Sequence, residues 1–405
     1  MPSDAPAIDL VDHRSFAGSQ PHEAFDHLRA TAPVHRHAEP DGPGFWAVTS
    51  HELVTEVGKD AARFSSEPTI MLRDPDDPDQ FGDHKMMLMC DPPLHTRMRR
   101  LVSRRFTPKS VRALHDGIAL LATKIVDEVI ERGECDLVTD LAGEMPSFVI
   151  ADLLGLPLED GRALYHHTET LHSATDAVGI EAQQAALGEM FAYAAGVHAA
   201  RTAEPTDDLA SLIANGAVDG TPVDEVDFFL WFLLLVDAGG DTTRNLVGGG
   251  MHHLFERPDA LHELTTDPDG LMGTAVEELL RFVSPVIHMR RTATAATTLG
   301  EQVIEAGDKV VMYYGAANRD PAVFADPHEL DLRRDPNPHV AFGGGGPHFC
   351  LGAHLARIEI AALLREVLTR LDGLRPAAEP AWMASNFIYG PTTLPVAFSA
   401  GPRAA

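Results

Sequence analysis

Four consecutive glycines and a proline stand before a cysteine near the C-terminal end, and no other stretch restricts the fold as much. The segment reads Phe342-Gly343-Gly344-Gly345-Gly346-Pro347-His348-Phe349-Cys350-Leu351-Gly352. Such a run cannot form a helix or a central strand, but it can form a tight loop whose backbone packs against something flat and large. A helix-like pattern follows, so a thiolate at Cys350 would lie at a helix start, where N–H groups and the dipole favour negative charge. The segment predicts either a loop that holds a soft anionic metal ligand or a turn beside an inert cysteine.

A long apolar segment earlier in the chain is interrupted by small and polar residues. Thr221-Pro222 is expected to open a helix that continues to about Phe255. Residues 228–236 are apolar on every side, so this helix should cross the core. Its middle reads Ala238-Gly239-Gly240-Asp241-Thr242-Thr243, and an acid followed by an alcohol is costly to bury without a purpose. The pattern predicts a proton relay to a buried reaction centre, with a kink that holds a hydrogen-bonded threonine as the alternative.

Charge is distributed unevenly along the chain. The formal net charge is −28, which argues against generic binding to nucleic acid or anionic membranes, yet residues 97–112 carry seven basic and no acidic side chains. In so acidic a chain, some of these side chains are expected to bind an anionic ligand and the others to dock an acidic protein, a solvated helix face being the alternative. His95 and Arg99, at i and i+4, would share one helix face and reach the same anionic group.

Composition and cysteine spacing bear on the cellular compartment of the protein. No run of about eighteen apolar residues is present and the first residues do not resemble a signal peptide, so no membrane anchor is expected. Cys90, Cys135 and Cys350 are odd in number and widely spaced, which argues against a disulfide framework or a structural zinc site and favours a reducing cytoplasm.

The remaining patterns are mostly helical. With no internal repeat or low-complexity linker, residues 1–405 are expected to form one domain, with 1–20 as a flexible segment. A long acidic, proline-bearing loop at 65–85 is expected to be a lid or disordered. Strands are expected at 34–37, 45–48 and 303–313, and helices at 21–31, 51–59, 113–132, 141–154, 160–172, 181–201 and after Cys350.

Together these motifs resemble the cytochrome P450 family, in its soluble bacterial class, from about residue 20 to 398. The glycine loop with Cys350 is similar to the haem-thiolate loop, and 238–243 to the oxygen-activation segment. Glu278-Leu279-Leu280-Arg281 is similar to the Glu-x-x-Arg motif, and Arg334 stands where the third partner of that pair lies. Residues 91–99 are similar to the helix that binds the haem propionates. The resemblance implies a mainly α fold, a large helical domain with small β-sheets, and haem b between the long central helix and the helix after Cys350.

The resemblance also implies roles for single residues. Cys350 would be the axial ligand of the iron, and Asp241 and Thr242 would deliver protons to the bound oxygen. Glu278, Arg281 and Arg334 would be structural. The other residues implied to contact the haem are the propionate ligands His95, Arg99, Arg291 and His348, together with Ala238, Gly239, Phe342, Gly343 and Gly352.

Partners follow from the same resemblance. It implies O2, a hydrophobic small molecule, and electrons from a ferredoxin and its ferredoxin reductase. The residues implied to line the substrate pocket are Met86, Met87, Met89, Leu234, Asp237, Val286, Ile287, His288, Phe387 and Ile388. The basic residues implied to dock the ferredoxin are Arg97, Arg100, Arg104, Arg105 and Arg357.

Two features depart from the usual pattern. Phe342 stands eight residues before Cys350 instead of seven, because the loop has one extra glycine. In this the loop resembles that of an actinobacterial branch of the family, whose enzymes oxidise sterols and methyl-branched lipids. Asp237 is a carboxylate where a small or apolar residue is common, four residues before Asp241. The leading hypothesis is a monooxygenase that hydroxylates a sterol, branched lipid or terpenoid-like molecule. The alternatives are other haem-thiolate chemistry such as peroxide-driven oxidation, action on a macrolide or a carrier-bound amino acid, and a non-catalytic haem-binding or recruitment module.

Overall fold

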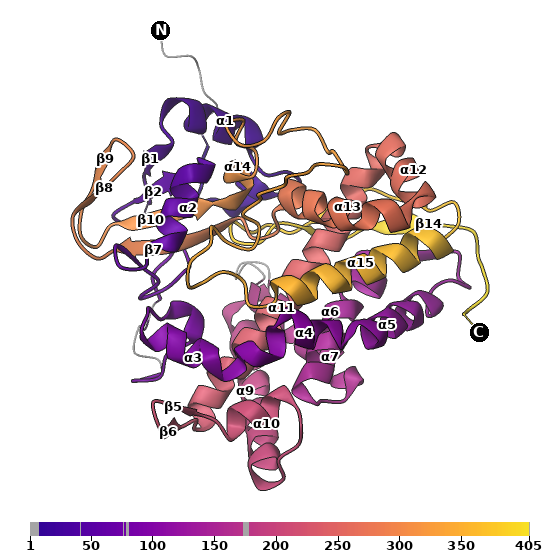
Figure 1. Cartoon of the computed structure of the whole chain (residues 1–405), viewed down its shortest axis with the longest axis horizontal. Helices are drawn as coiled ribbons and strands as arrows, with labels where there is room; N and C mark the ends of the chain where they lie inside the picture. Colours follow the sequence, from indigo (N-terminus) through magenta and orange to yellow (C-terminus); the bar gives the residue numbers. More distant parts are fainter. Residues whose placement is uncertain (1–7, 41, 76, 78–80, 173–177, 405) are drawn as a thin grey trace.

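Helices fill most of the structure, and the strands gather mainly along one side of it, at the left of Figure 1. This computed structural model describes residues 8–40, 42–75, 77, 81–172 and 178–404. The α-helices, in chain order, are α1 His22–Thr31, α2 His51–Lys59, α3 Leu94–Ser103, α4 Pro108–Arg112, α5 His115–Asp127, α6 Glu144–Leu154, α7 Leu158–His172, α9 Ile180–Ala203, α10 Leu209–Ala214, α11 Glu225–Phe255, α12 Pro258–Thr266, α13 Pro268–Val283, α14 Tyr314–Ala317 and α15 Ala353–Arg370.

The largest sheet joins strands that are far apart in the sequence. Its order is β1-β2-β10-β7-β3, with β10 parallel to β2 and antiparallel to β7. Three smaller hairpins and one three-stranded sheet, of order β11-β14-β4, complete the strands of the described residues. The strands are β1 Val34–His37, β2 Phe45–Val48, β3 Phe64–Ser65, β4 Glu134–Asp136, β5 Ala217–Val218, β6 Thr221–Pro222, β7 His288–Ala293, β8 Thr297–Leu299, β9 Gln302–Ile304, β10 Lys309–Tyr313, β11 Arg375–Pro376, β12 Ala381–Trp382, β13 Pro391–Thr393 and β14 Pro395–Ala397.

Helix α11 crosses the core, as its apolar sequence predicts. It contacts α6, α7, α9, α13 and α15, and nearly all of its side chains from Phe228 to Val236 are buried. Its start differs from the expectation: Thr221-Pro222 pairs with Ala217-Val218 in a hairpin, and the helix begins after Asp224, whose carboxylate caps the amide of Asp227. A side-chain oxygen at the N-cap satisfies a free helix N–H better than a proline two residues earlier can.

The N-terminal segment is packed from residue 8 onward, which corrects the expectation of a flexible 1–20; residues 1–7 lie outside the described part. Leu10 and Phe16 are fully buried. The Gln20 amide donates to the carbonyls of Val283 and Ser284 at 3.0 and 3.1 Å. Apolar burial and these hydrogen bonds fix the segment against the end of α13.

Loop 65–85 forms no helix or strand in its described residues beyond Ser65, and ion pairs hold it at both ends. Asp74 contacts Arg290 at 2.6 Å, and His84 Nδ1 lies 2.9 Å from Asp227 at the start of α11. The acidic stretch at 76 and 78–80, named in the expectation, lies outside the described residues.

Several element bounds also differ from the expectation. The helix expected at 113–132 is shorter, α10 was not expected, and 303–313 contains two strands separated by a turn. A π-helical turn at Val138–Ala142 precedes α6. Over the described residues, no single helix has the length and apolar character to cross a membrane; helices Val138–Leu154 and Leu158–Leu171, bent by 117°, meet that test only as a pair.

Candidate functional site

The glycine loop packs against helix α2, and this contact explains its glycines. A Cβ on Gly344 would lie 2.7 Å from the carbonyl oxygen of Val54, and one on Gly346 would lie 2.4 Å from that of Gly58. Gly343, Gly345 and Gly346 also have φ values of +97°, +95° and +76°. These glycines are therefore required by backbone approach and left-handed conformation. A flat partner, which the sequence suggested as the reason, is not what meets Gly344 and Gly346.

Cys350 ends the loop directly before α15. Its amide donates to the Phe342 carbonyl at 3.0 Å, and its side chain is exposed. Although the side chain is accessible, desolvation by the dense protein around it raises the pKa of the Cys350 thiol, against the opposing effects of the Gly352 and Ala353 amides and of Arg99 and Arg357. The helix start therefore does not by itself make Cys350 a thiolate. Coordination to a metal ion would, because the ion's charge removes the proton.

Four nitrogen-bearing side chains converge beside this loop. The His95 and His348 rings lie 4.1 Å apart, and Arg99 and Arg291 are close enough to influence the titration of both. Burial, followed by these cations, lowers the pKa of His95 to about 4 and that of His348 to about 2, so both imidazoles are neutral near pH 7. Nδ1 of each ring is buried without a hydrogen bond.

This cluster fits a ligand with carboxylates. Within the described residues neither Arg99 nor Arg291 forms an ion pair, and burial lowers the pKa of both guanidinium groups. Buried cations without a partner are unfavourable unless an anion joins them. A cavity of about 350 Å³ lined by His95, Arg99, Gly346 and Pro347 opens beside them. The four residues suit the two propionates of haem b, with Cys350 as the soft ligand of its iron.

The middle of α11 has one accessible face. Ala238 is exposed and Thr242, one turn later, is partly exposed, although the helix around them is buried. The Thr242 hydroxyl donates to the Ala238 carbonyl at 3.1 Å. Asp241 is fully buried, and its Oδ1 lies 3.4 Å from Nη2 of Arg244. The two residues predicted to form a relay therefore lie in different surroundings, the alcohol accessible and the acid paired.

The partners of Asp241 were not found by sequence reasoning. Arg244 is itself fully buried and also contacts Tyr165 and Glu169 of α7. An arginine in an apolar helix is a signal that an acid lies nearby. Its partners could not be named, because Tyr165 and Glu169 belong to a helix of ordinary polar composition about 75 residues away.

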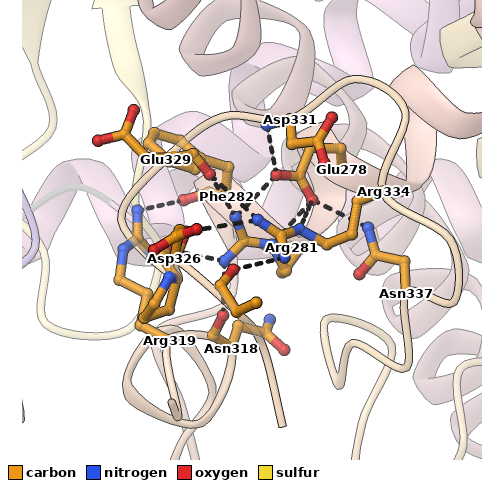
Figure 2. Close-up of polar contacts among 12 residues, drawn as sticks. Glu278, Arg281, Phe282, Asn318, Arg319, Asp326, Glu329, Asp331, Arg334 and Asn337 are labelled. Atoms are coloured by element: carbon orange, nitrogen blue, oxygen red, sulfur yellow. Dashed lines mark hydrogen bonds and ion pairs between the residues drawn. The ribbon is translucent and has the colours of Figure 1, made fainter.

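The Glu278–Arg281 pair is the centre of a buried polar network (Figure 2). Two hydrogen bonds of 2.8 Å join the two side chains, and Arg334 Nε lies 3.1 Å from Glu278 Oε2. Arg281 also donates to the backbone carbonyls of Asn318, Pro327 and Glu329. These hydrogen bonds hold the segment between β10 and the glycine loop against α13. Such contacts suit a structural role for the pair.

The basic residues predicted to dock a ferredoxin divide into two sets. Arg97 and Arg105 pair with Asp219 and Asp207, and Arg357 donates twice to Glu277 of α13. Their charges are thus partly compensated within the chain, and their place on a docking surface stays a prediction. Four basic side chains of this segment are exposed and hold no ion pair within the described residues: Arg100, Arg104, Lys109 and Arg112.

The predicted pocket residues fall into a buried group and a partly exposed group. Ile287, His288 and Ile388 are at most 4% exposed, and Met87 and Leu234 are 7% exposed. His288 is held by the Asn386 carbonyl at 2.8 Å and packs against Phe387 and Tyr313, so its ring lies in the core, and its contact with a substrate stays a prediction. The partly exposed members of the predicted set are Met86, Met89, Asp237, Val286 and Phe387.

Comparison with known proteins finds relatives over nearly the whole chain. The family model described as Cytochrome P450 matches residues 233–381. A methyl-branched lipid omega-hydroxylase of Mycobacterium tuberculosis is 38% identical over 390 residues, 93% of this chain and 90% of that protein. A steroid C26-monooxygenase of Mycolicibacterium smegmatis is 38% identical over 400 residues, 97% and 96% of the two chains.

Solved structures give the same result. A Mycobacterium marinum cytochrome P450 in complex with pseudoionone matches with a TM-score of 0.89 at 36% identity, covering 98% of this chain and 100% of that one. A Bacillus megaterium cytochrome P450 in complex with testosterone matches with a TM-score of 0.83 at 30% identity, covering 93% and 97%.

Proposed function

The chain belongs to the cytochrome P450 family and is a haem b monooxygenase, and from this premise we propose that it hydroxylates an apolar lipid of the sterol or methyl-branched type. The observation that supports this choice is the similarity, over more than nine-tenths of the chain, to relatives named for methyl-branched lipids and steroids. The accessible members of the predicted pocket, apart from Asp237, are apolar: Met86, Met89, Val286 and Phe387. Such a lining favours an apolar substrate.

The chain's own residues supply binding and proton handling. Haem, when bound, supplies the activation of dioxygen, and a thiolate ligand favours cleavage of the O–O bond. We assign Cys350 as that ligand and His95, Arg99, Arg291 and His348 to the two propionates. The accessible Thr242 hydroxyl would pass a proton toward the substrate side of α11, and Asp241, next to it in the chain, would replace that proton from solvent.

The substrate proposal is tested by the spin state of the resting haem. Titration with cholestenone, a methyl-branched fatty acid, a terpenoid and a macrolide should displace the iron-bound water only where the ligand fills the pocket. We expect the low-to-high-spin absorption shift at micromolar concentrations of the sterol or the branched acid. A shift with the macrolide or terpenoid alone would overturn the substrate class. A carbon monoxide difference band typical of an imidazole ligand would overturn the assignment of Cys350.

We also propose that electrons come from an acidic ferredoxin that docks on the exposed basic side chains Arg100, Arg104, Lys109 and Arg112. Opposite charges steer association and make its rate fall with ionic strength. The variant Arg100→Glu/Arg104→Glu should slow reduction of the haem by the ferredoxin about tenfold at low salt, since this steering changes association rates by roughly 10–1000-fold. Stopped-flow reduction measures this rate. Arg375→Glu reverses an exposed charge outside the segment and is the control; equal slowing in both, or no dependence on salt, would contradict the docking surface.

The three thiols fit the reducing compartment that we propose for this protein. All three cysteines are free, and burial raises the pKa of Cys90 and of Cys135 to about 12. Neither thiol is therefore reactive at neutral pH, because the thiolate is the reactive form.

A further inference from the structure

Two histidines and a glutamate meet at the C-terminal end of α11, where no role has been assigned above. His252 Nε2 lies 3.6 Å from Glu256 Oε1, and His253 Nδ1 lies 3.1 Å from Glu256 Oε2. Each of the three side chains offers one metal-ligating atom, and these atoms all lie within 4.8 Å of one another. The haem assignments use none of them. The three residues therefore form a candidate site of their own.

Aromatic contacts hold both imidazole rings of this group. The His252 ring meets Trp382 of β12 at 83°, with 5.0 Å between the centroids. The His253 ring meets Phe282 of α13 at 82°, also with 5.0 Å between the centroids. The histidine side chains are 20% and 15% exposed, whereas that of Glu256 is 51% exposed. Two potential ligands are thus held by packing before any ion binds, and the third can turn toward an ion that arrives from solvent.

The surroundings favour the protonation states that metal binding needs. Burial lowers the pKa of both His252 and His253, against the raising effect of Glu256. Arg257 also lowers the pKa of His252, and Arg319 lowers that of His253. The hydrogen bond with His253 is the main reason why the pKa of Glu256 falls to about 2. Two neutral imidazoles and an ionised carboxylate are therefore present near pH 7, and only deprotonated groups bind metal ions.

We propose that His252, His253 and Glu256 bind one zinc ion. Imidazole nitrogens and a carboxylate oxygen are ligands that zinc favours, and a water molecule can take the fourth position. Two ligand atoms on a tetrahedral zinc ion lie about 3.4 Å apart, so the separations of 3.1 and 3.6 Å require only small side-chain rotations. The group also stands at the C-terminal end of a long helix, where the helix dipole favours a cation.

The neighbouring charges set the expected strength of binding. Glu379 lies close enough to His252 to raise its pKa, and it adds a second negative charge near the group. Arg257 opposes it, because its Nη1 lies 3.4 Å from Glu256 Oε2 and competes for that carboxylate. Arg319 is a second cation close to the group. Because these cations offset much of the negative charge, we expect a micromolar affinity instead of a nanomolar one.

A second group of similar composition in the described part of the chain provides a contrast. His84 lies 3.7 Å from Asp224 and 2.9 Å from Asp227, at the start of α11. The hydrogen bond with Asp227 raises the pKa of His84, so this ring favours the protonated form, which has no lone pair for a metal ion. Zinc is therefore assigned to the other end of the helix, and His84→Gln is a control for the assignment.

Calorimetric titration of the tag-free, haem-loaded protein with zinc chloride tests the proposal. We expect one zinc ion per chain with a micromolar Kd, and no binding of magnesium, which imidazole suits poorly. His253→Gln and Glu256→Gln should each weaken zinc binding at least tenfold, since loss of an outer-shell partner alone costs about 10–100-fold. The controls His84→Gln and His262→Gln, the latter at an exposed histidine of α12, should keep the wild-type Kd.

Two results would overturn the proposal. One is a wild-type Kd in Glu256→Gln, a variant that changes a half-exposed side chain and so remains informative even if His253→Gln does not fold. The other is an anomalous diffraction peak for zinc that lies away from these three side chains in zinc-soaked crystals of the haem-loaded protein; we expect the strongest peak between them. Both measurements are made without substrate, so their outcome does not depend on the proposed hydroxylation.

Discussion

Glu277 shows how one side chain can support a site that it does not touch. It lies on α13, accepts hydrogen bonds from Arg357 of α15, one of them 2.8 Å long, and lies 3.0 Å from His339. The Arg357 guanidinium in turn covers the ring of Phe342, 4.5 Å from its centroid. Glu277 therefore connects the helix after Cys350 with the residue that begins the glycine loop, and its charge holds Arg357 in place.

The pKa of Glu277 leads to a prediction about acid stability. Burial alone would raise this pKa, but Arg357 and His339 lower it to about 2 from its usual 4.5. A carboxylate with a depressed pKa in the folded state stabilises it above pH 4.5, and this contribution is lost as the pH falls toward 2. Glu277→Gln should therefore lower the free energy of unfolding at pH 7 by about 1–3 kcal/mol, with a difference that shrinks below pH 4.

Chemical denaturation over this pH range measures the effect. Glu131→Gln is the control, because Glu131 pairs with Arg403 and both side chains are about 60% exposed, so its loss should change little. A destabilisation of Glu277→Gln that stays constant from pH 7 to pH 2 would contradict the ion-pair explanation.

The glycine loop and α2 behave as one unit, because their backbones touch. Replacing Gly344 by alanine would place a Cβ 2.7 Å from the Val54 carbonyl and 3.0 Å from Cα of Thr55. Neither atom is the end of a flexible side chain, so the loop must move and Cys350 moves with it. We expect Gly344→Ala to cost about 1–3 kcal/mol of stability and to reduce the thiolate-type carbon monoxide band per mole of haem.

Gly273→Ala is the matched control for this substitution. Gly273 lies exposed within α13, and an added Cβ meets no atom within 4 Å. Alanine there should stabilise the protein by roughly 0.5–1 kcal/mol, since it is the better helix former. If Gly344→Ala keeps the full band and the wild-type stability, the backbone contact does not fix the position of Cys350.

Sequence alone predicts the local structure of these elements but not the contacts between them. Residues 342–352 were recognisable as a loop before a helix, because glycine and proline exclude other structures. The reason for the glycines was not, since it lies in α2, almost three hundred residues earlier in the chain. Likewise the Glu278–Arg281 pair follows from spacing within one helix, whereas the contact of Arg244 with Glu169 depends on how α7 and α11 pack. Contacts within one helix can be read from residue spacing, whereas contacts between distant helices depend on the tertiary packing.

One large hydrophobic cluster connects residues from near both ends of the chain. It includes Leu10 and Phe16 near the start, the apolar part of α11, and Phe398 near the end. A second, smaller cluster lies under the main sheet, with Val48, Val57 and Val310 among its members. Because the large cluster runs through nearly all helices, we propose that the chain folds as one domain.

Haem should contribute strongly to the stability of this unit. The buried Arg291 and the half-buried Arg99 hold no ion pair within the described residues, and the propionates would supply one for each. A ligand that binds only the folded state stabilises it by mass action, about 4 kcal/mol at a thousandfold excess over Kd. Removal of haem should therefore lower the Tm by about 5 °C, since a chain of 405 residues unfolds with an entropy of about 0.85 kcal/mol/K.

Calorimetry of the holoprotein and of the protein after haem extraction measures this difference. Arg99→Gln should reduce the gap by weakening haem binding, while the Tm of its haem-free form should be at least that of the wild type, because a half-buried cation without an ion pair has been removed. An equal Tm with and without haem would contradict the assignment of the cluster to the propionates.

The contact between the glycine loop and α2 also bears on how this protein is made. Helix α2 leaves the ribosome long before the loop and Cys350, because it lies far ahead of them in the chain. Domains begin to fold from the N-terminal side during synthesis, but contacts between distant parts of the sequence form late. The surface that positions Cys350 is thus ready long before Cys350 itself arrives. Haem acquisition is accordingly expected to wait until the loop has emerged and packed on α2, and to depend on a supply of free haem at that moment.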